Sequence, residues 1–219
     1  MELQGKRINF LGDSITYGHG TSSPDKRFTN LLKERLQLAA ANNYGISGTR
    51  IAVQHKPSTE PTWDLDFCSR ASQMEPDADV IVVFGGTNDF GHGDAPIGCM
   101  SDRTPDTFYG ACHTLMQTLI SRYPEAVIVF LTPLHRCNED NPRGDGGKPE
   151  DVGVLSRYVD ILRETARWYS LPVLDLFAVS GLQPRVPAIQ SRYVPDGLHP
   201  NDAGHEILAD RIESFLRAL

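Results

Sequence analysis

Short apolar runs alternate with amphipathic segments along most of this chain. Five runs are typical of buried strands: Ile8–Leu11, a short one around Asn42–Tyr44, Val80–Phe84, Ala126–Leu131 and Pro172–Leu176. Apolar residues at helical spacing predict helices across Phe28 to Leu36, near Thr104–Tyr123, near Val152–Ser170 and about Asn201–Ala218. Continuous apolar strands separated by amphipathic helices imply a parallel sheet that is covered on both faces.

The predicted fold class is therefore α/β, with a five-stranded parallel sheet in a three-layer α/β/α arrangement. The length of 219 residues suits one such domain, and no repeat or linker divides residues 1–219. Two stretches are predicted to be long loops, Phe90–Arg103 and His135–Glu150. Long loops in a compact domain are often functional, although surface decoration is an equally open interpretation here.

Composition narrows the classes of partner. Hydrophobic residues make up 40% of the chain and charged residues 22%, which is an ordinary balance for a soluble protein. The net charge of −7 argues against nucleic acid and against anionic membrane surfaces as partners. The longest apolar runs are too short to cross a bilayer.

The cysteines and the first residues favour a cytoplasmic location. The four cysteines are few for the length and show no close pairing, which suits a reducing compartment, although a disulfide between two of them stays open. The segment Met1–Lys6 lacks the apolar region of a secretion signal. We therefore expect a cytoplasmic protein.

Ser14 is the first candidate for chemistry, because it follows a predicted strand directly. The strand Ile8–Leu11 stops at Gly12-Asp13-Ser14, and open α/β sheets build ligand sites beyond the carboxyl ends of their strands. A serine hydroxyl is a weak nucleophile that needs a neighbouring base. Serine is also a good helix N-cap, and Asp13 is suited to a local turn, so a purely structural role is the alternative.

Two further segments place hydrogen-bond donors after predicted strands. Gly48 offers a backbone N–H with no side chain in the way, and Asn88 offers a side-chain amide. Both groups suit an oxyanion hole, and both are also common in plain turns. Asp89, next to Asn88, is suited to fixing the loop rather than touching substrate.

An acid and a base lie close together near the other end of the sequence. Prolines and a glycine make a helix unlikely across Pro195–Pro200, and a bent loop of this length can bring Asp196 onto His199. The carboxylate then orients the imidazole to take the proton of Ser14. A polar turn leading into the last helix is the alternative, and Asp175 is a weaker candidate for the orienting acid.

With these four blocks in this order, the sequence resembles the SGNH (GDSL-type) hydrolase superfamily. The resemblance rests on Gly12-Asp13-Ser14, on Gly48 in Asn43-Tyr44-Gly45-Ile46-Ser47-Gly48, on Gly86-Thr87-Asn88-Asp89 and on Asp196-Gly197-Leu198-His199. It spans nearly the whole chain and implies the flavodoxin-like SGNH hydrolase fold for residues 1–219. Ile15 stands where the family's usual motif has leucine, a mild apolar exchange. The Gly-x-Ser-x-Gly elbow of the α/β-hydrolases is absent around Ser14.

The resemblance also implies a role for each site residue. Ser14 is the nucleophile and the first oxyanion donor through its backbone N–H, and the Gly48 N–H and the Asn88 side chain are the other donors. His199 is the base, with Asp196 as its partner. The implied function is a serine esterase that cleaves short-chain acyl esters, acetyl esters of carbohydrates among them, through an acyl-enzyme.

The sequence also leads to expectations about cofactors and metals, and it leaves rival functions open. No cofactor is expected, and no metal, since His-x-His, His-Glu-x-x-His and Cys-x-x-Cys are all absent. The expected partner is a small ester, and the oligomeric state is left open. The rivals are a non-catalytic carbohydrate- or acyl-binding module on the same fold, an acyltransferase, and a metal-dependent phosphoesterase that uses Asp13, Asn88, Asp89 and His199.

Two interpretations of Trp63 stay open. Trp63 and the surrounding stretch Gln54–Arg70 either line the substrate cleft or cover the edge of the sheet. The sequence favours neither.

Overall fold

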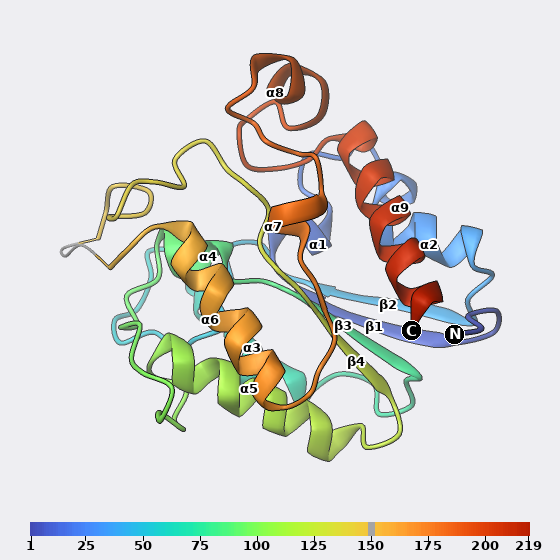
Figure 1. Ribbon diagram of the computed structural model, residues 1–219, viewed down its shortest axis with the longest axis horizontal. Helices are drawn as coiled ribbons and strands as arrows, with labels where there is room; N and C mark the ends of the chain where they lie inside the picture. The colour runs from blue at the N-terminus through green and yellow to red at the C-terminus, as the bar shows by residue number, and fades with distance from the viewer. Residues whose placement is uncertain (149–151) are drawn as a thin grey trace.

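Five parallel strands form one sheet in a computed structural model that describes residues 1–148 and 152–219 (Figure 1). The strands are β1 (Arg7–Gly12), β2 (Ala40–Gly45), β3 (Val80–Phe84), β4 (Val127–Leu131) and β5 (Val173–Leu174), in the order β2-β1-β3-β4-β5. This is the flavodoxin-like order, in which the chain reverses its direction of winding between β1 and β3. The predicted fold class is confirmed.

Helices cover both faces of the sheet (Figure 1). One core cluster joins the sheet to α3 (Phe67–Ala71), α5 (Phe108–Arg122) and α6 (Leu155–Trp168), and the other joins it to α2 (Phe28–Arg35) and α9 (Asp202–Ala218). The remaining helices are short: α1 (Ser14–Tyr17), α4 (Thr87–Gly91), α7 (Leu176–Val179) and α8 (Pro187–Tyr193), with 3-10 turns at Pro24–Lys26 and Pro61–Asp64.

β1, β2 and β3 end at the same level of the sheet. Gly12, the last residue of β1, pairs with Gly45 of β2 on one side and with Phe84 of β3 on the other. All five residues of β3 are buried, as their unbroken apolar run predicts. Segments that leave β1, β2 and β3 therefore start from the same edge of the sheet.

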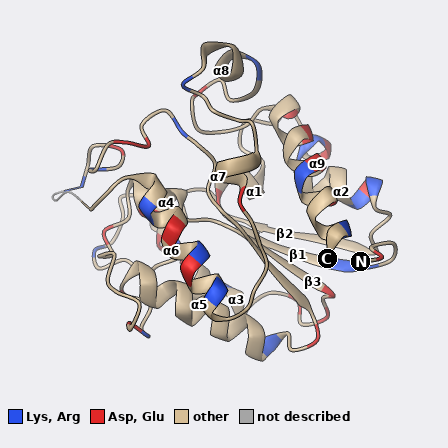
Figure 2. Cartoon of the chain, in the orientation of Figure 1, with Lys and Arg blue, Asp and Glu red and all other residues tan. Residues whose placement is uncertain are grey.

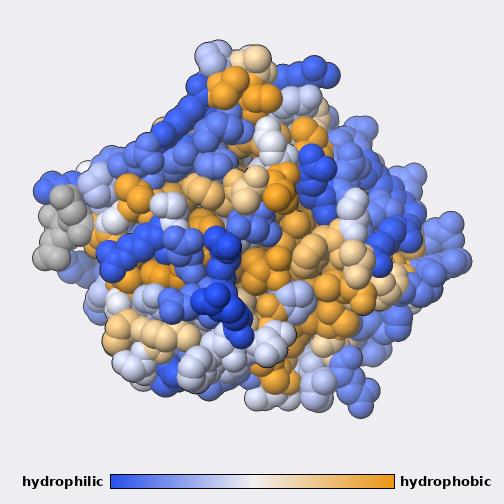
Figure 3. Space-filling model, in the orientation of Figure 1, coloured by the Kyte–Doolittle hydropathy of each residue, from blue (hydrophilic) through white to orange (hydrophobic). Residues whose placement is uncertain are grey.

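The two edge strands differ most from their predicted ranges. β2 is longer than Asn42–Tyr44 and half-buried throughout, and its polar Asn42 and Asn43 form hydrogen bonds instead of an apolar stripe. β5 is shorter than Pro172–Leu176, because Pro172 has no N–H to donate to a sheet and Asp175 already caps the helix that begins at Leu176. So short a strand covers little of the edge, and apolar side chains gather in the middle of the face in Figure 3.

Helix boundaries also differ from the prediction. The predicted helix Thr104–Tyr123 begins at Phe108, because Thr107 caps it by accepting a hydrogen bond from the N–H of Gly110. The predicted helix Val152–Ser170 is Leu155–Trp168. The predicted helix from Asn201 is right to one residue, with Asn201 as its N-cap.

The two predicted loops are only partly as expected. Phe90 and Gly91 belong to α4, so the first loop starts later than predicted. His135 to Lys148 contains turns and no helix or strand, while Pro149 and Glu150 of the predicted loop lie outside the described residues. Within that loop, Cys137 donates its N–H to the carbonyl of Gly197 at 2.9 Å, so the loop braces the segment that carries His199.

The described surface helices carry mixed charge (Figure 2), and the cysteines are unpaired. Basic and acidic side chains are intermixed along α6 and α9 (Figure 2). No helix in the described ranges is long and apolar enough to cross a membrane. All four cysteines lie in the described ranges and are free, and Cys112 is core, as its place on the apolar stripe of its helix predicts.

Candidate active site

Ser14 is held at the rim of the sheet by a tight turn after β1. Gly12 leaves no room for a side chain, since a β-carbon there would lie 2.0 Å from Oγ1 of Thr16. Asp13 is the N-cap of α1 and accepts a hydrogen bond from the N–H of Ile15 at 3.0 Å. The capping alternative for Ser14 is therefore wrong, because Asp13 fills that role and Ser14 is the first residue of the helix.

The hydroxyl of Ser14 meets the imidazole of His199, although 185 positions separate them in sequence. Oγ of Ser14 lies 2.9 Å from Nε2 of His199, and Ser14 is only 6% exposed. Nδ1 of His199 lies 2.6 Å from Oδ2 of Asp196. A carboxylate can only accept, so Nδ1 carries the proton and Nε2 is free to accept from the serine.

The loop around Gly197 brings Asp196 onto its own histidine. Gly197 has a φ of 79°, in the left-handed region that favours glycine. Oδ1 of Asp196 accepts the backbone N–H groups of Leu198 at 2.9 Å and His199 at 2.7 Å. The carboxylate therefore fixes both the backbone and the ring of the histidine. The bent loop predicted for Pro195–Pro200 is what the structure shows.

The environment lowers the pKa of both His199 and Asp196. Burial lowers the pKa of His199, the charges of His19 and Arg136 act in the same direction, and only Asp196 opposes them. Burial alone would raise the pKa of Asp196, but hydrogen bonds from His199 and Leu198 hold it below its usual value. At neutral pH the imidazole is uncharged and the carboxylate is ionised.

Gly48 and Asn88 reach the same rim from the two neighbouring strands. Gly48 follows β2 with a φ of 76°, and Asn88 lies in the first turn of α4, buried to 5% exposure. Nδ2 of Asn88 donates to the carbonyl of Thr49 at 3.0 Å, so the two segments are joined. Among the described residues, no acceptor takes the backbone N–H of Ser14 or of Gly48. These N–H groups are available to a ligand.

Asp89 fixes the loop that follows Gly48, as predicted. Its two carboxylate oxygens accept the N–H groups of Ile51 and Ala52, each at 2.9 Å. Lys148 donates to the carbonyl of Asp89 at 2.6 Å, and burial lowers the pKa of this lysine to about 8. Each carboxylate oxygen of this buried side chain is held by a backbone N–H, so Asp89 supports the loop.

A buried arginine, which sequence reasoning missed, ties the segments that leave β1 and β2 together. Arg70 on α3 donates to the carbonyl of Gly12 at 3.2 Å, to Oγ1 of Thr49 at 2.9 Å and to the carbonyl of Tyr44. Burial lowers the pKa of Arg70 to about 10, still far above neutral, so it stays charged. No motif in the sequence marks it.

Asp13, next to Ser14, is a second buried titratable group. Burial raises the pKa of Asp13 to about 7, against a lowering effect of the hydrogen bond from Ile15, and the charge of Asp89 adds to the increase. The positive charges of Arg70 and Arg136 act against burial. Arg136 is 4% exposed and donates to the carbonyl of Thr87 at 3.2 Å and to Asp145.

One group of side chains in the described residues has the spacing of metal ligands. Ligand atoms of His19, Asp196 and His199 lie within 4.8 Å of one another, and the rings of His19 and His199 are 4.3 Å apart. His199 already hydrogen-bonds Asp196 through Nδ1 and contacts Ser14 through Nε2. An ion held here would therefore compete with the Ser14–His199 contact.

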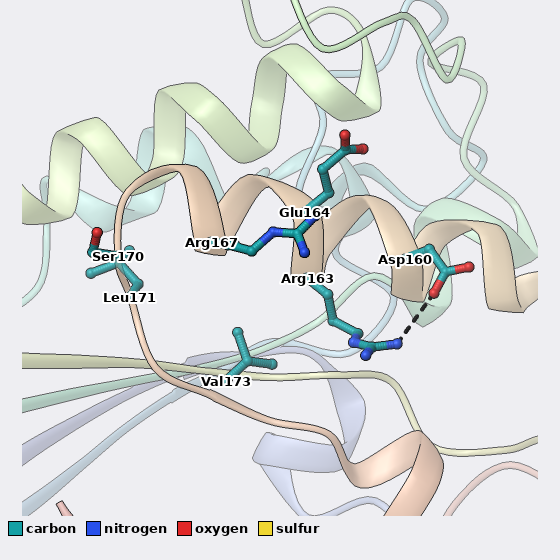
Figure 4. A pocket seen from close by; sticks show the side chains of 7 residues that line it. All are labelled: Asp160, Arg163, Glu164, Arg167, Ser170, Leu171 and Val173. Atoms are coloured by element: carbon teal, nitrogen blue, oxygen red, sulfur yellow. Dashed lines mark hydrogen bonds and ion pairs between the residues drawn. The ribbon is translucent and has the colours of Figure 1, made fainter.

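A groove lies at the other end of the sheet from Ser14's neighbours, and one of its lining residues, Arg163, pairs with Asp175. It has a volume of about 710 Å³ and runs between α6 and β5, lined in part by Arg163, Glu164 and Arg167 (Figure 4). Nε of Arg163 lies 3.4 Å from Asp175, whose carboxylate also accepts from Thr132 at 3.0 Å. Asp175 is thus committed to this side of the fold, and Asp196 is the acid beside His199.

The sequence and the fold both have relatives among known proteins. Residues 10–207 match the model of the GDSL-like Lipase/Acylhydrolase family. The GDSL lipase Rv0518 of Mycobacterium tuberculosis is 32% identical over 216 residues, which cover 95% of this chain and 80% of that protein. A crystal structure of a protein from Lactobacillus plantarum is 30% identical, with a TM-score of 0.84 and coverage of 99% of this chain and 98% of that one.

A third relative is more distant and shares the fold. It is a two-domain esterase active on acetylated mannans, 21% identical, with a TM-score of 0.64 over 99% of this chain and 49% of that one. At this identity the likeness concerns the arrangement of strands and helices alone.

Proposed function

Because this chain belongs to the GDSL-like lipase/acylhydrolase family, we propose that it is a metal-independent serine esterase with Ser14, His199 and Asp196 as its catalytic triad. Family membership makes it an ester hydrolase in general terms. The observation that carries the finer proposal is the pair of contacts that joins Ser14 to His199 at 2.9 Å and His199 to Asp196 at 2.6 Å. We take residues 1–219 as one hydrolase domain.

The reaction follows from the positions of these groups. Oγ of Ser14 attacks the ester carbonyl while Nε2 of His199 takes its proton, and the charge on Asp196 stabilises the imidazolium. The N–H groups of Ser14 and Gly48 and the amide of Asn88 stabilise the oxyanion. The carbon–oxygen bond to the alcohol breaks, and the alcohol leaves with the proton from His199. Water then attacks the acyl-serine with His199 as base and releases the acid.

We propose short acyl esters as substrates, with acetyl groups on carbohydrates as the leading class. The family resemblance suggests this class, and a relative of the same fold acts on acetylated mannans, so acetylated sugars belong in the screen. A screen of p-nitrophenyl acetate, longer p-nitrophenyl esters and acetylated sugars, run with and without EDTA, tests the proposal. We expect acid release from the short esters that is insensitive to EDTA. Loss of activity in EDTA would favour the metal-dependent phosphoesterase instead.

The pH dependence of the reaction should follow His199. The unprotonated imidazole is the active form, so kcat/KM should rise with pH through the pKa of His199 and then level off. Burial, His19 and Arg136 lower that pKa from its ordinary 6.5. The midpoint of the rise in kcat/KM for p-nitrophenyl acetate should therefore lie below 6.5. A midpoint above that value would contradict the assignment of His199 as the base in this environment.

A further inference from the structure

Trp63 lies directly on Gly48. A β-carbon built on Gly48 would be 2.1 Å from Cδ1 and 2.2 Å from Nε1 of the indole, so the edge of the ring fills the space where a side chain would stand. Trp63 is half-buried and sits in the 3-10 turn Pro61–Asp64, whose N-cap is Glu60. Trp63 therefore packs against the segment that offers the Gly48 N–H.

A histidine packs against the indole, and a buried arginine holds the backbone of the turn that carries it. The ring of His92 lies 4.7 Å from that of Trp63, measured between centroids. Arg50 donates to the carbonyl of Trp63 at 3.0 Å, to Asp64 at 2.6 Å and to Nδ1 of His92 at 3.2 Å. Its side chain is only 3% exposed, so the indole stands on a fixed support rather than on a free loop.

His92 also connects this support to Asn88. Its backbone N–H donates to the carbonyl of Asn88 at 3.0 Å. An arginine can only donate, so Nδ1 of His92 accepts, which requires a neutral ring; burial and the charge of Arg50 lower the pKa of His92 to about 4. The Trp63–His92 pair therefore spans the two segments that carry Gly48 and Asn88.

We propose that the Trp63 indole is the wall of the acyl pocket and limits the acyl group to short chains. The inference rests on the proposed esterase activity. The leaving alcohol must lie beside Nε2 of His199, from which it takes its proton, and the ring of His19 borders that side at 4.3 Å. The acyl chain then extends past the oxyanion donors, where Trp63 and His92 stand. A chain longer than a few carbons meets the indole.

A series of p-nitrophenyl esters with acyl chains of increasing length tests whether Trp63 limits the acyl group. We expect the unaltered protein to prefer p-nitrophenyl acetate to the hexanoate. Trp63→Ala should raise the hexanoate-to-acetate ratio of kcat/KM by about tenfold or more, because a shortened wall admits the extra methylenes. Trp63→Phe should change the ratio in the same direction by less. Trp168 is 63% exposed at the end of α6, and Trp168→Ala is the matched control that should leave the ratio unchanged.

A binding measurement covers the case in which Trp63→Ala fails to fold. The chain has two tryptophans, so Trp168→Phe leaves Trp63 as the sole tryptophan, whose emission is excited apart from that of the tyrosines. Butylboronic acid, which can add to the Ser14 hydroxyl, should change the emission of Trp63 at concentrations that inhibit hydrolysis of p-nitrophenyl acetate. The same compound should leave the emission unchanged when Ser14→Ala is added.

The outcomes distinguish the proposed role of Trp63 from the proposed esterase activity. Hydrolysis with an unchanged chain-length ratio in Trp63→Phe, together with unchanged emission under inhibition, overturns the wall and leaves the esterase standing. Such a result would make Trp63 a cover for the sheet edge alone. Absence of ester cleavage by the unaltered protein overturns both the esterase and the wall.

Discussion

Ser14→Ala should reduce the turnover of p-nitrophenyl acetate by about 10⁴-fold or more, because the variant has no nucleophile and retains only binding and the oxyanion donors. The fold should persist. The Ser14 hydroxyl contacts the ring of His199, while the cap of α1 is made by Asp13, and alanine is well tolerated in a helix. Turnover, thermal unfolding and labelling by a fluorophosphonate probe measure the three effects.

A matched serine separates loss of the nucleophile from loss of any serine. Ser121 lies exposed in α5, and none of the contacts around Ser14 involves it. Ser121→Ala should keep full turnover and the probe label, while Ser14→Ala should lose both. If the folded Ser14→Ala protein still hydrolyses the ester at a comparable rate, the acyl-enzyme mechanism is wrong. If the unaltered protein takes no label and cleaves no ester, the non-catalytic binding module becomes the better interpretation.

Asn88→Ala should lower kcat by about 10²- to 10³-fold, the usual effect of removing one oxyanion donor. One N–H of its amide group is engaged by the carbonyl of Thr49 at 3.0 Å, and the second N–H remains for the substrate. Because that second contact strengthens only as the carbonyl oxygen gains charge, KM should change little. The measurement is a full kinetic comparison on p-nitrophenyl acetate.

Asn88→Ala also removes the hydrogen bond to the carbonyl of Thr49, so the structural effect of losing an amide hydrogen bond needs its own control. Asn42 on β2 also uses its amide in a side-chain hydrogen bond, to Oδ1 of Asn9 at 2.9 Å. Asn42→Ala should keep kcat near that of the unaltered protein. A loss in Asn88→Ala confined to KM would mean that Asn88 only positions the Gly48 segment. Equal losses in both variants would point to general loosening of the sheet.

Much of the architecture was predictable, because the strong signals in the sequence come from fully buried elements. The run Val80–Phe84 is apolar throughout and is a central strand over the same range. β2 gave a weaker signal, since an edge strand is only half-buried and can carry Asn42 and Asn43. The short helices α3, α7 and α8 span seven residues or fewer, too few to establish a helical repeat.

The candidate site was predictable for a different reason. Residues that follow parallel strands share one edge, so Ser14, Gly48 and Asn88 had to lie near one another once the strands were correct. The segment of Asp196 and His199 follows no strand, and its part in the site was inferred from an acid and a base in one bent loop and then from the resemblance. Arg70 could not be found in this way and the role of Trp63 stayed open, because both depend on packing between segments distant in sequence.

The buried acid beneath the nucleophile makes proton uptake part of folding. In the unfolded chain Asp13 releases its proton near pH 3.8, whereas in the native protein it keeps that proton up to about pH 7. Between these limits the native state binds a proton that the unfolded chain has lost, so Asp13 contributes most below pH 3.8 and progressively less toward neutrality. As the pH rises, the stability contributed by Asp13 therefore falls while the share of unprotonated His199 increases. The pH range in which His199 can act as a base is the range in which Asp13 contributes least to stability.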